Sequence, residues 1–295
     1  MSPFRIWLMA ARPRTLPAAV APVLVGTALA ATLGTFKVLT FIATLLGALF
    51  IQIGANLSND YSDARRGADT EDRLGPVRVT AGGLVPPKQV LIATYVAFGL
   101  AVLVGVYLIV TAGWQILAIG AASILAGVLY TGGPKPYGYE GLGEVFVFLF
   151  FGVAAVTGTY FAQREEWAWE SFALAVPVGL LAVAILMVNN VRDLETDRRA
   201  GKRTLAVRLG RDRARTLYAV TVYVAFLTAP VAWLAGGTGL SAWLLLPWLA
   251  LPLAAPVVRI VRNRVDGPSL NQALARTGQL QLVFCVLLSA GLLAS

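Results

Sequence analysis

The chain has 295 residues, of which 58% are hydrophobic and 13% charged, and it carries a formal net charge of +9. Its mean hydropathy of +0.73 excludes an ordinary soluble enzyme. Because the sequence has no histidine and a single cysteine, Cys285, it excludes an internal disulfide, a histidine general base and the usual transition-metal ligand.

Nine apolar stretches follow one another, each long enough to cross the hydrocarbon core of a bilayer. Backbone polar groups must be satisfied inside lipid, so we predict helices, and long runs without alternation exclude an outer-membrane β-barrel. We interpret the first stretch as a retained helix and not as a signal peptide. The predicted fold class is an all-α polytopic membrane protein with nine transmembrane helices, in a single domain over residues 1–295. The stretches cover residues 15–34, 38–59, 87–111, 114–131, 143–163, 171–191, 214–235, 241–260 and 272–293.

The basic residues are distributed unevenly between the connections of these helices. If the N-terminus is cytoplasmic, 22 of the 24 Lys and Arg residues lie on the cytoplasmic side, and only Lys37 and Arg164 lie outside. This positive-inside bias is typical of a multi-pass protein of the cell membrane, so the net charge does not indicate nucleic-acid binding. The long polar connections lie on the same side, which predicts a cytoplasmic active face and an external C-terminus.

The second span ends in NLSNDYSDARRGADTEDRLGP (56–76), which holds a third of the acidic residues of the chain. On a continuing helix, Asn56, Asp60 and Asp63 share one face. Ionisable residues at membrane depth are costly and usually functional, which favours a binding site at these positions. Glu71 and Asp72 are interpreted instead as members of a solvated loop that pair with its arginines.

The fourth span ends in YTGGPKPYGYEGLGEV (130–145), where glycines and prolines break the helix. Tyr130 lies at the helix end opposite the acidic cluster, and we predict that it faces a cation or uses its hydroxyl group. Tyr137 and Tyr139 are interpreted as part of the aromatic belt at the membrane surface.

The sixth span ends in NNVRDLETDRRAGKR (189–203), where Asp193 and Asp197 lie four residues apart on one helical face. If this helix packs against the second span, Asp60 and Asp63 point into the same cavity as this pair. Four carboxylates raise one another's pKa unless cations neutralise them, and Mg²⁺ shared with substrate phosphates is the cation that such oxygen ligands prefer. Basic residues on the same side fit a diphosphate: Arg73, Arg78, Lys135, Lys202 and Arg203.

The two acidic motifs also form a weak internal repeat. NLSNDYSD (56–63) ends the second span, and NNVRDLETD (189–197) ends the sixth, so each follows the second helix of a group of four. We therefore predict two similar four-helix groups plus one further helix, with the site between the groups.

These motifs, together with ARPRTLPAAVAPVLVGTALA (11–30), resemble the UbiA-type intramembrane prenyltransferases over most of the chain and in the same order. The RRGAD insertion at 65–69 and the RLGP that begins at Arg73 are typical of the branch that prenylates 1,4-dihydroxy-2-naphthoate in menaquinone synthesis. The resemblance implies a ring of nine helices around a central cavity that is open to lipid.

The resemblance also implies roles for individual residues. Arg73, Lys135 and Lys202 are expected to contact the diphosphate. Asn190 stands where the family often has an aspartate, so one cation site is expected to take a neutral oxygen ligand. Residues at metal–diphosphate positions of the family are Asn59, Asp60, Asp63, Asp193, Asp197 and, with a less close match, Asp69.

The activity implied is an Mg²⁺-dependent transfer of a polyprenyl group from an allylic polyprenyl diphosphate to 1,4-dihydroxy-2-naphthoate, with loss of CO₂ and diphosphate. Arg12 and Lys135 are the candidates for binding the carboxylate of the acceptor, although topology alone also explains a basic residue at Arg12. Two alternatives stay open, namely another acceptor such as 4-hydroxybenzoate, and an ion-coupled transporter that uses the same intramembrane acids.

Overall fold

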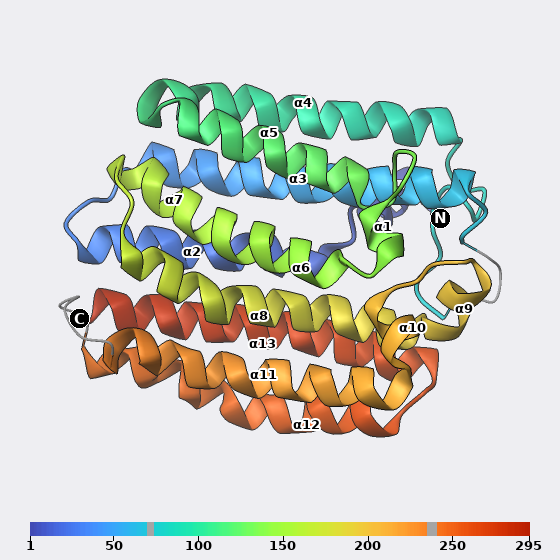
Figure 1. The fold of residues 1–295 in the computed structure, drawn as a ribbon. Coiled ribbons are helices and arrows are strands. Elements are labelled where there is room, and N and C mark those ends of the chain that lie inside the picture. The colour runs from blue at the N-terminus through green and yellow to red at the C-terminus, as the bar shows by residue number, and fades with distance from the viewer. Residues whose placement is uncertain (70–73, 235–240) are drawn as a thin grey trace.

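The computed structural model describes residues 1–69, 74–234 and 241–295, and over these residues it is helical without strands (Figure 1). The first half contains α1 (Pro3–Ala11), η1 (Pro13–Thr15), α2 (Pro17–Thr32), α3 (Val38–Arg65), α4 (Pro87–Ala112), α5 (Trp114–Leu129), η2 (Tyr137–Glu140), α6 (Gly143–Val147), the π-helical η3 (Phe148–Ala154) and α7 (Ala155–Arg164). The second half contains α8 (Trp169–Arg192), α9 (Leu194–Arg199), α10 (Leu205–Leu209), α11 (Arg211–Leu234), η4 (Ala242–Ala250), α12 (Leu251–Asn263) and α13 (Gly267–Leu293).

Seven helical spans of the described residues are long and apolar enough to cross a membrane, and they become eight if the bent pair α1–η1 and α2 is one span. The remaining apolar helix, α5, has 16 residues. It is therefore about 24 Å long, which is shorter than the roughly 30 Å hydrocarbon core of a typical bilayer. The prediction of a polytopic all-α protein is confirmed, whereas nine crossings and the repeat of two four-helix groups stay predictions.

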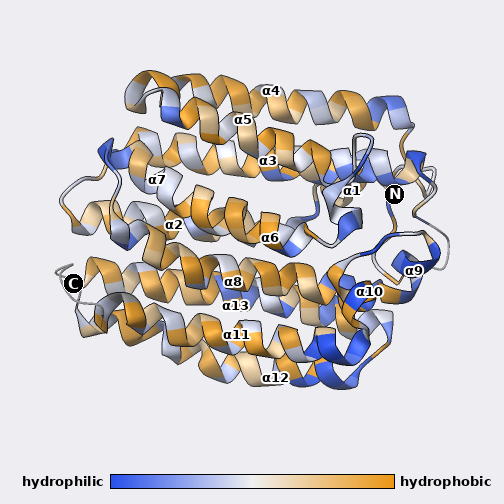
Figure 2. Ribbon diagram, viewed as in Figure 1, coloured by the Kyte–Doolittle hydropathy of each residue, from blue (hydrophilic) through white to orange (hydrophobic). Residues whose placement is uncertain are grey.

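The long helices lie side by side in a bundle, with α4 and α5 at one edge and α11 and α12 at the other (Figure 1). The two termini lie at opposite ends of this bundle, and α9 and α10 cover the end near the N-terminus. Hydrophilic residues gather at that same end, around α9, α10 and the start of α11 (Figure 2). The bundle thus has a polar end, which carries α9 and α10, and a largely apolar length.

The main apolar core lies among α2, α8, α11 and α13, where fully buried residues such as Leu29, Leu181, Tyr218 and Phe284 pack together. On the other side, η3 approaches α8 very closely, because a Cβ atom on Gly152 would lie 2.6 Å from the Cα atom of Gly179. This half of the bundle is therefore closely packed. A cavity lies between it and α3, α4 and α5.

Candidate active site

A cavity of about 440 Å³ runs along the inside of the bundle. At the polar end it is lined by Asp63, Asp193 and Asp197, and its lining extends along α3 and α4 to Thr44 and Ile109. Most of the lining between these points is apolar. The cavity therefore has the form of a polar head that continues into a long apolar channel.

The α3 wall of the polar head carries Asn56, Asn59 and Asp63. The buried carboxylate of Asp63 accepts a hydrogen bond from the Tyr139 hydroxyl at 2.7 Å, and its other oxygen lies 3.1 Å from Lys202 Nζ. Burial raises the pKa of Tyr139, and the charge of Asp63 raises it further, so the phenol stays protonated and donates. Lys202 Nζ also lies 4.7 Å from the centre of the Tyr139 ring, and Asn59 accepts a hydrogen bond from Thr131.

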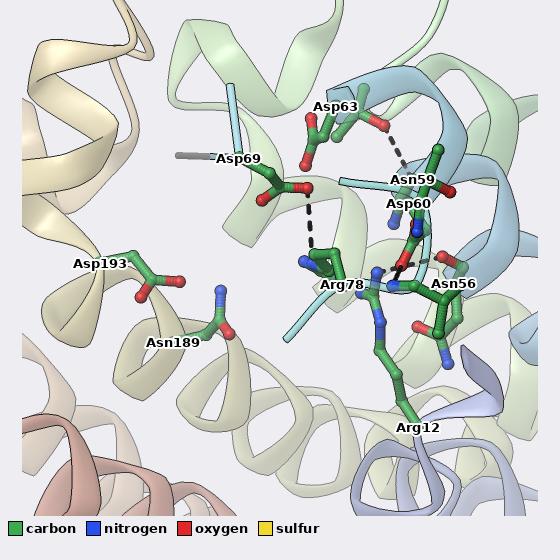
Figure 3. Close-up of polar contacts among 12 residues, drawn as sticks. Arg12, Asn56, Asn59, Asp60, Asp63, Asp69, Arg78, Asn189 and Asp193 are labelled. Carbon is green, nitrogen blue, oxygen red and sulfur yellow. Dashed lines mark hydrogen bonds and ion pairs between the residues drawn. The ribbon is translucent and has the colours of Figure 1, made fainter. Parts of the chain in front are cut away.

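Asp60 is buried on the same helix but is not among the residues that line the cavity. Its carboxylate accepts hydrogen bonds from the backbone N–H groups of Val79 at 3.2 Å and Thr80 at 2.9 Å. Asp60 thereby fastens the segment that carries Arg78, which does line the cavity. In Figure 3, Arg78 lies between the α3 residues and those of α8, and its Nε atom is 3.7 Å from Asp69.

The α8 wall carries Asn189, Asn190 and Asp193. Arg192, which is 2% exposed, donates to both carboxylate oxygens of Asp193, at 2.8 and 2.6 Å. The same guanidinium donates to the side-chain oxygens of Asn189 at 2.7 Å and Asn271 at 2.8 Å. Asn271 in turn donates to the carbonyl of Leu74, so a single buried arginine connects the α8 acid to α13 and to the segment before Arg78.

Arg12 enters the cavity from the bend between α1 and α2. Its backbone is left-handed, with φ of 54°, a conformation that costs a non-glycine residue free energy and clusters at functional sites. Thr15 holds this bend by donating from its hydroxyl to the Arg12 carbonyl, and the hydroxyl accepts from Gln52 and Asn56. The Arg12 guanidinium reaches the carbonyl of Asn56 at 3.1 Å.

Aromatic rings line the cavity next to the polar head. Tyr137 stacks on Phe146, with ring centroids 3.9 Å apart, and makes an edge contact with Tyr130, with ring centroids 5.5 Å apart. Phe146 continues to Phe150 at 6.2 Å. Tyr130 also lines the cavity, and its predicted role toward a cation stays a prediction.

Several predictions about individual residues need correction. Lys135 is exposed and is not among the residues that line the cavity, because the loop at 132–136 turns it to the surface. Tyr139, which we assigned to the aromatic belt, instead hydrogen-bonds Asp63. Arg73 lies outside the described residues.

Of the four carboxylates that were expected to point into one cavity, Asp63, Asp193 and Asp197 line it and Asp60 does not, and the described residues contain no group of three or more acidic side chains placed to hold a metal ion. Asp60 binds backbone amides, and Asp63 and Asp193 are each paired with a basic side chain. The donor set still fits Mg²⁺ that is shared with a phosphate, since one or two carboxylates from the protein suffice for such an ion. Asp63 and Asp193, which lie on opposite walls in Figure 3, provide these oxygens around a single cavity that Asp197 also lines.

Two residues next to the cavity, Arg192 and Glu144, were not predicted from the sequence. Arg192 was counted among the cytoplasmic topology charges, and only the fold shows that it turns inward. Glu144, which accepts from Asn190, stands at the start of an apolar stretch and was the one acidic residue there. A lone acid at a span boundary is the signal that could have found it.

Comparison with known proteins gives a consistent result. Residues 19–276 match the model of the UbiA prenyltransferase family. A protein of Mycobacterium tuberculosis named 1,4-dihydroxy-2-naphthoate octaprenyltransferase is 41% identical, and the match covers 99% of this chain and 98% of that protein. A protein of the same name from Escherichia coli is 37% identical over 98% of this chain and 95% of its own length.

Solved structures share the fold at much lower sequence identity. A UbiA homolog from Archaeoglobus fulgidus bound to GPP and Mg²⁺ matches with a TM-score of 0.66 at 15% identity, over 98% of this chain and 100% of that one. The apo structure of a UbiA homolog from Aeropyrum pernix K1 matches with a TM-score of 0.70 at 14% identity, over 95% and 97% of the two chains. The helical arrangement is therefore that of these UbiA homologs.

Proposed function

The chain belongs to the UbiA prenyltransferase family, and we propose that it transfers a polyprenyl group from an allylic polyprenyl diphosphate to 1,4-dihydroxy-2-naphthoate. The products are demethylmenaquinol, CO₂ and diphosphate. The observation that carries this proposal is the cavity, which joins a head of acids and basic groups to a long apolar channel. A diphosphate fits the head, and an isoprenoid chain fits the channel. The names of the relatives at 35–41% identity support the naphthoate acceptor.

The residues of the polar head have complementary tasks toward the donor. Asp63, Asp193 and Asp197 would hold Mg²⁺, which when bound stabilises the negative charge that develops on the departing diphosphate. Lys202 and Arg78 line the same cavity and bind phosphate oxygens. Asp60 fixes the Arg78 segment, and Tyr139 keeps Asp63 in place through its hydrogen bond.

The aromatic walls serve the next step. The allylic C–O bond breaks and its electron pair leaves with the diphosphate, so that a carbocation remains beside Tyr130 and Tyr137. Their π faces attract a cation, and the stacked rings of Phe146 and Phe150 exclude water that would otherwise trap it. The acceptor ring then forms the new C–C bond at its carboxylated carbon. The electrons of the C–CO₂⁻ bond restore the aromatic ring as CO₂ leaves.

The isoprenoid tail extends away from the head along α3, α4 and α5. Gly105 and Gly120 line this channel, and a Cβ atom placed on either would have no heavy atom within 4 Å. These positions keep the channel wide over a large part of the bilayer depth. The apolar part of the cavity therefore explains why the reaction takes place inside a membrane protein.

The experiment that tests the function is an acceptor panel with purified protein and a radiolabelled polyprenyl diphosphate. We expect transfer to 1,4-dihydroxy-2-naphthoate with release of its carboxyl carbon as CO₂, and poor transfer to 1,4-dihydroxynaphthalene, which lacks the carboxylate. Preferred transfer to 4-hydroxybenzoate or to another aromatic acceptor would overturn the naphthoate assignment and leave the prenyl transfer intact. If no acceptor is prenylated, the proposed prenyltransferase activity is contradicted.

We further predict that Arg12→Ala raises the KM for the acceptor by roughly 10-fold or more, the effect of losing a hydrogen bond to a charged group. The KM for the polyprenyl diphosphate should stay nearly unchanged, because Arg12 lies on the α2 side of the cavity, away from Asp193 (Figure 3). Steady-state kinetics measure both constants. Lys135→Ala is the control, since this lysine lies outside the cavity lining and should change neither constant.

A rise in the donor KM instead would place Arg12 with the diphosphate-binding groups. If neither constant changes, Arg12 is a topology charge, and its left-handed bend has a purely structural role.

The proposed location is the cell membrane, with the N-terminus and the polar head in the cytoplasm and the C-terminus outside. The strong excess of Lys and Arg on one side supports this orientation, as does the position of the termini at opposite ends of the bundle. A reporter fused after Ser295 that is active only outside the cytoplasm should be active. An inactive reporter, together with activity of a cytoplasmic reporter fused at the same position, would mean that the number of crossings is even.

A further inference from the structure

Two neighbouring asparagines at the end of α8, Asn189 and Asn190, both line the polar head of the cavity. A side-chain amide has a carbonyl that accepts and an NH₂ group that donates, so its chemistry toward a ligand depends on which way it is turned. The hydrogen-bond partner behind each amide fixes its orientation. In this structure one partner is an acceptor, Glu144, and the other is a donor, Arg192.

Asn190 donates from its NH₂ group to Glu144 Oε1 at 2.9 Å. Glu144 is buried, with 8% of its surface exposed, and it comes from the start of α6. In this bond a carboxyl oxygen of Glu144 is the acceptor, so it takes the NH₂ group of the amide and not the carbonyl. The amide oxygen of Asn190 therefore stays available on the cavity side. An oxygen is the ligand that a cation such as Mg²⁺ prefers.

Asn189 has the reverse arrangement. Its carbonyl accepts from Arg192 Nη2 at 2.7 Å. A guanidinium carries only donors, so it selects the carbonyl and leaves the NH₂ group of Asn189 for the cavity. That group can donate to a phosphate oxygen but cannot bind a cation. Adjacent residues of identical type thus present opposite chemistry to one ligand.

We propose that Glu144 is a positioning residue, which acts through Asn190 by presenting its amide oxygen to the cation that accompanies the prenyl diphosphate. Arg192 has the matching task for Asn189 and the phosphate. The inference rests on the proposed function, because it takes the diphosphate–Mg²⁺ pair as the ligand of the polar head. Glu144 itself does not line the cavity, so it contacts neither the cation nor the substrate directly.

The proposal predicts the effect of Glu144→Gln. Glutamine can offer its own NH₂ group, which allows Asn190 to turn over and place its NH₂ group toward the cation. The Mg²⁺ concentration that gives half-maximal binding of a prenyl S-thiolodiphosphate should rise about 10-fold, as is typical when a residue that orients a metal ligand is lost. This analogue does not ionise, so calorimetric titration at a series of Mg²⁺ concentrations measures binding without turnover.

The decisive variant is the combination Glu144→Gln with Asn190→Asp. A carboxylate at position 190 has an oxygen on both sides and needs no orientation, and Gln at position 144 can donate to one of them. The double variant should return the half-maximal Mg²⁺ concentration to within about threefold of the original protein. Asn190→Asp alone should not improve Mg²⁺ binding, because it places two carboxylates in contact. Glu140→Gln is the control, since this acid is part-exposed, pairs with Arg208 and lies outside the cavity lining.

Each outcome decides the matter. An unchanged Mg²⁺ dependence in Glu144→Gln would overturn the proposal. So would a loss that the double variant does not restore, especially if both proteins melt at lower temperature in detergent, because Glu144 would then serve packing alone. If the original protein shows no Mg²⁺-dependent binding of the analogue, the proposed function itself fails, and this inference fails with it. A failure of the naphthoate assignment alone leaves the result unaffected, since no acceptor is present.

Discussion

Excess chelator is expected to abolish prenyl transfer, and added Mg²⁺ is expected to restore it. The polar head must bind a diphosphate between Asp63 on one wall and Asp193 and Asp197 on the other. Carboxylates repel phosphate oxygens unless a cation lies between them. Lys202 is paired with Asp63 and Arg192 with Asp193, so the net positive charge that they bring to the leaving group is small, and Mg²⁺ is expected to supply the rest.

The measurement is transfer of radiolabelled prenyl groups by protein dialysed against chelator, followed by titration with Mg²⁺. Inorganic diphosphate offers a control for ion competition, because it should inhibit only when Mg²⁺ is present. Full turnover in excess chelator would contradict the requirement. The basic side chains of the head would then perform the ionisation without a metal.

Asp63→Asn and Asp193→Asn should each reduce turnover by at least roughly 100-fold, the scale of losing one electrostatic stabiliser of a transition state. Either change removes a negative charge that faces the cavity and leaves a buried cation, Lys202 or Arg192, without its partner. Single-turnover rates at saturating Mg²⁺ measure the effect. Asp212→Asn is the matched control, because this aspartate is exposed in the first turn of α11 and lies outside the cavity lining.

Asp60→Asn should be equally damaging for a different reason. The carboxylate holds two backbone N–H groups of the segment that carries Arg78, and an asparagine would turn a donor toward one of them. We therefore expect a rise in the KM for the donor together with lower thermal stability. A variant of Asp60, Asp63 or Asp193 with near-normal turnover would remove that residue from the site.

Some residues that the sequence singled out lie on the wall of one cavity. Asp193 and Asp197 were predicted to share a helical face, and both line the cavity, as does Lys202, although α8 ends at Arg192 and Asp197 lies on the separate helix α9. Helical periodicity predicted the same environment for Asp60 and Asp63, but only Asp63 lines the cavity. Asp60 is covered by residues 79–80, which lie outside the helix in sequence and fold back onto α3. The same limit applies to Lys135 and Lys202, which lie in similar polar loops but end on the surface and in the cavity, respectively.

Hydropathy located the apolar helices but did not settle how many of them cross the membrane. α5 was predicted as a full span at 114–131, and in the structure it ends at Leu129 with 16 residues. Tyr139 was assigned to the membrane surface because tyrosine is common there, and its hydrogen bond to Asp63 depends on a turn at 136–141 that composition does not reveal. Membership of the UbiA family, in contrast, was predicted from the motifs and is confirmed.

The pairing of Asp63 with Lys202 and of Asp193 with Arg192 has a consequence for the folded protein before a metal ion binds. In many metalloproteins the ligands of the ion repel one another, and the protein folds only when the metal ion is bound. Here each of these carboxylates has its own counter-charge within the chain. In the folded protein these two charges are therefore balanced without a divalent ion.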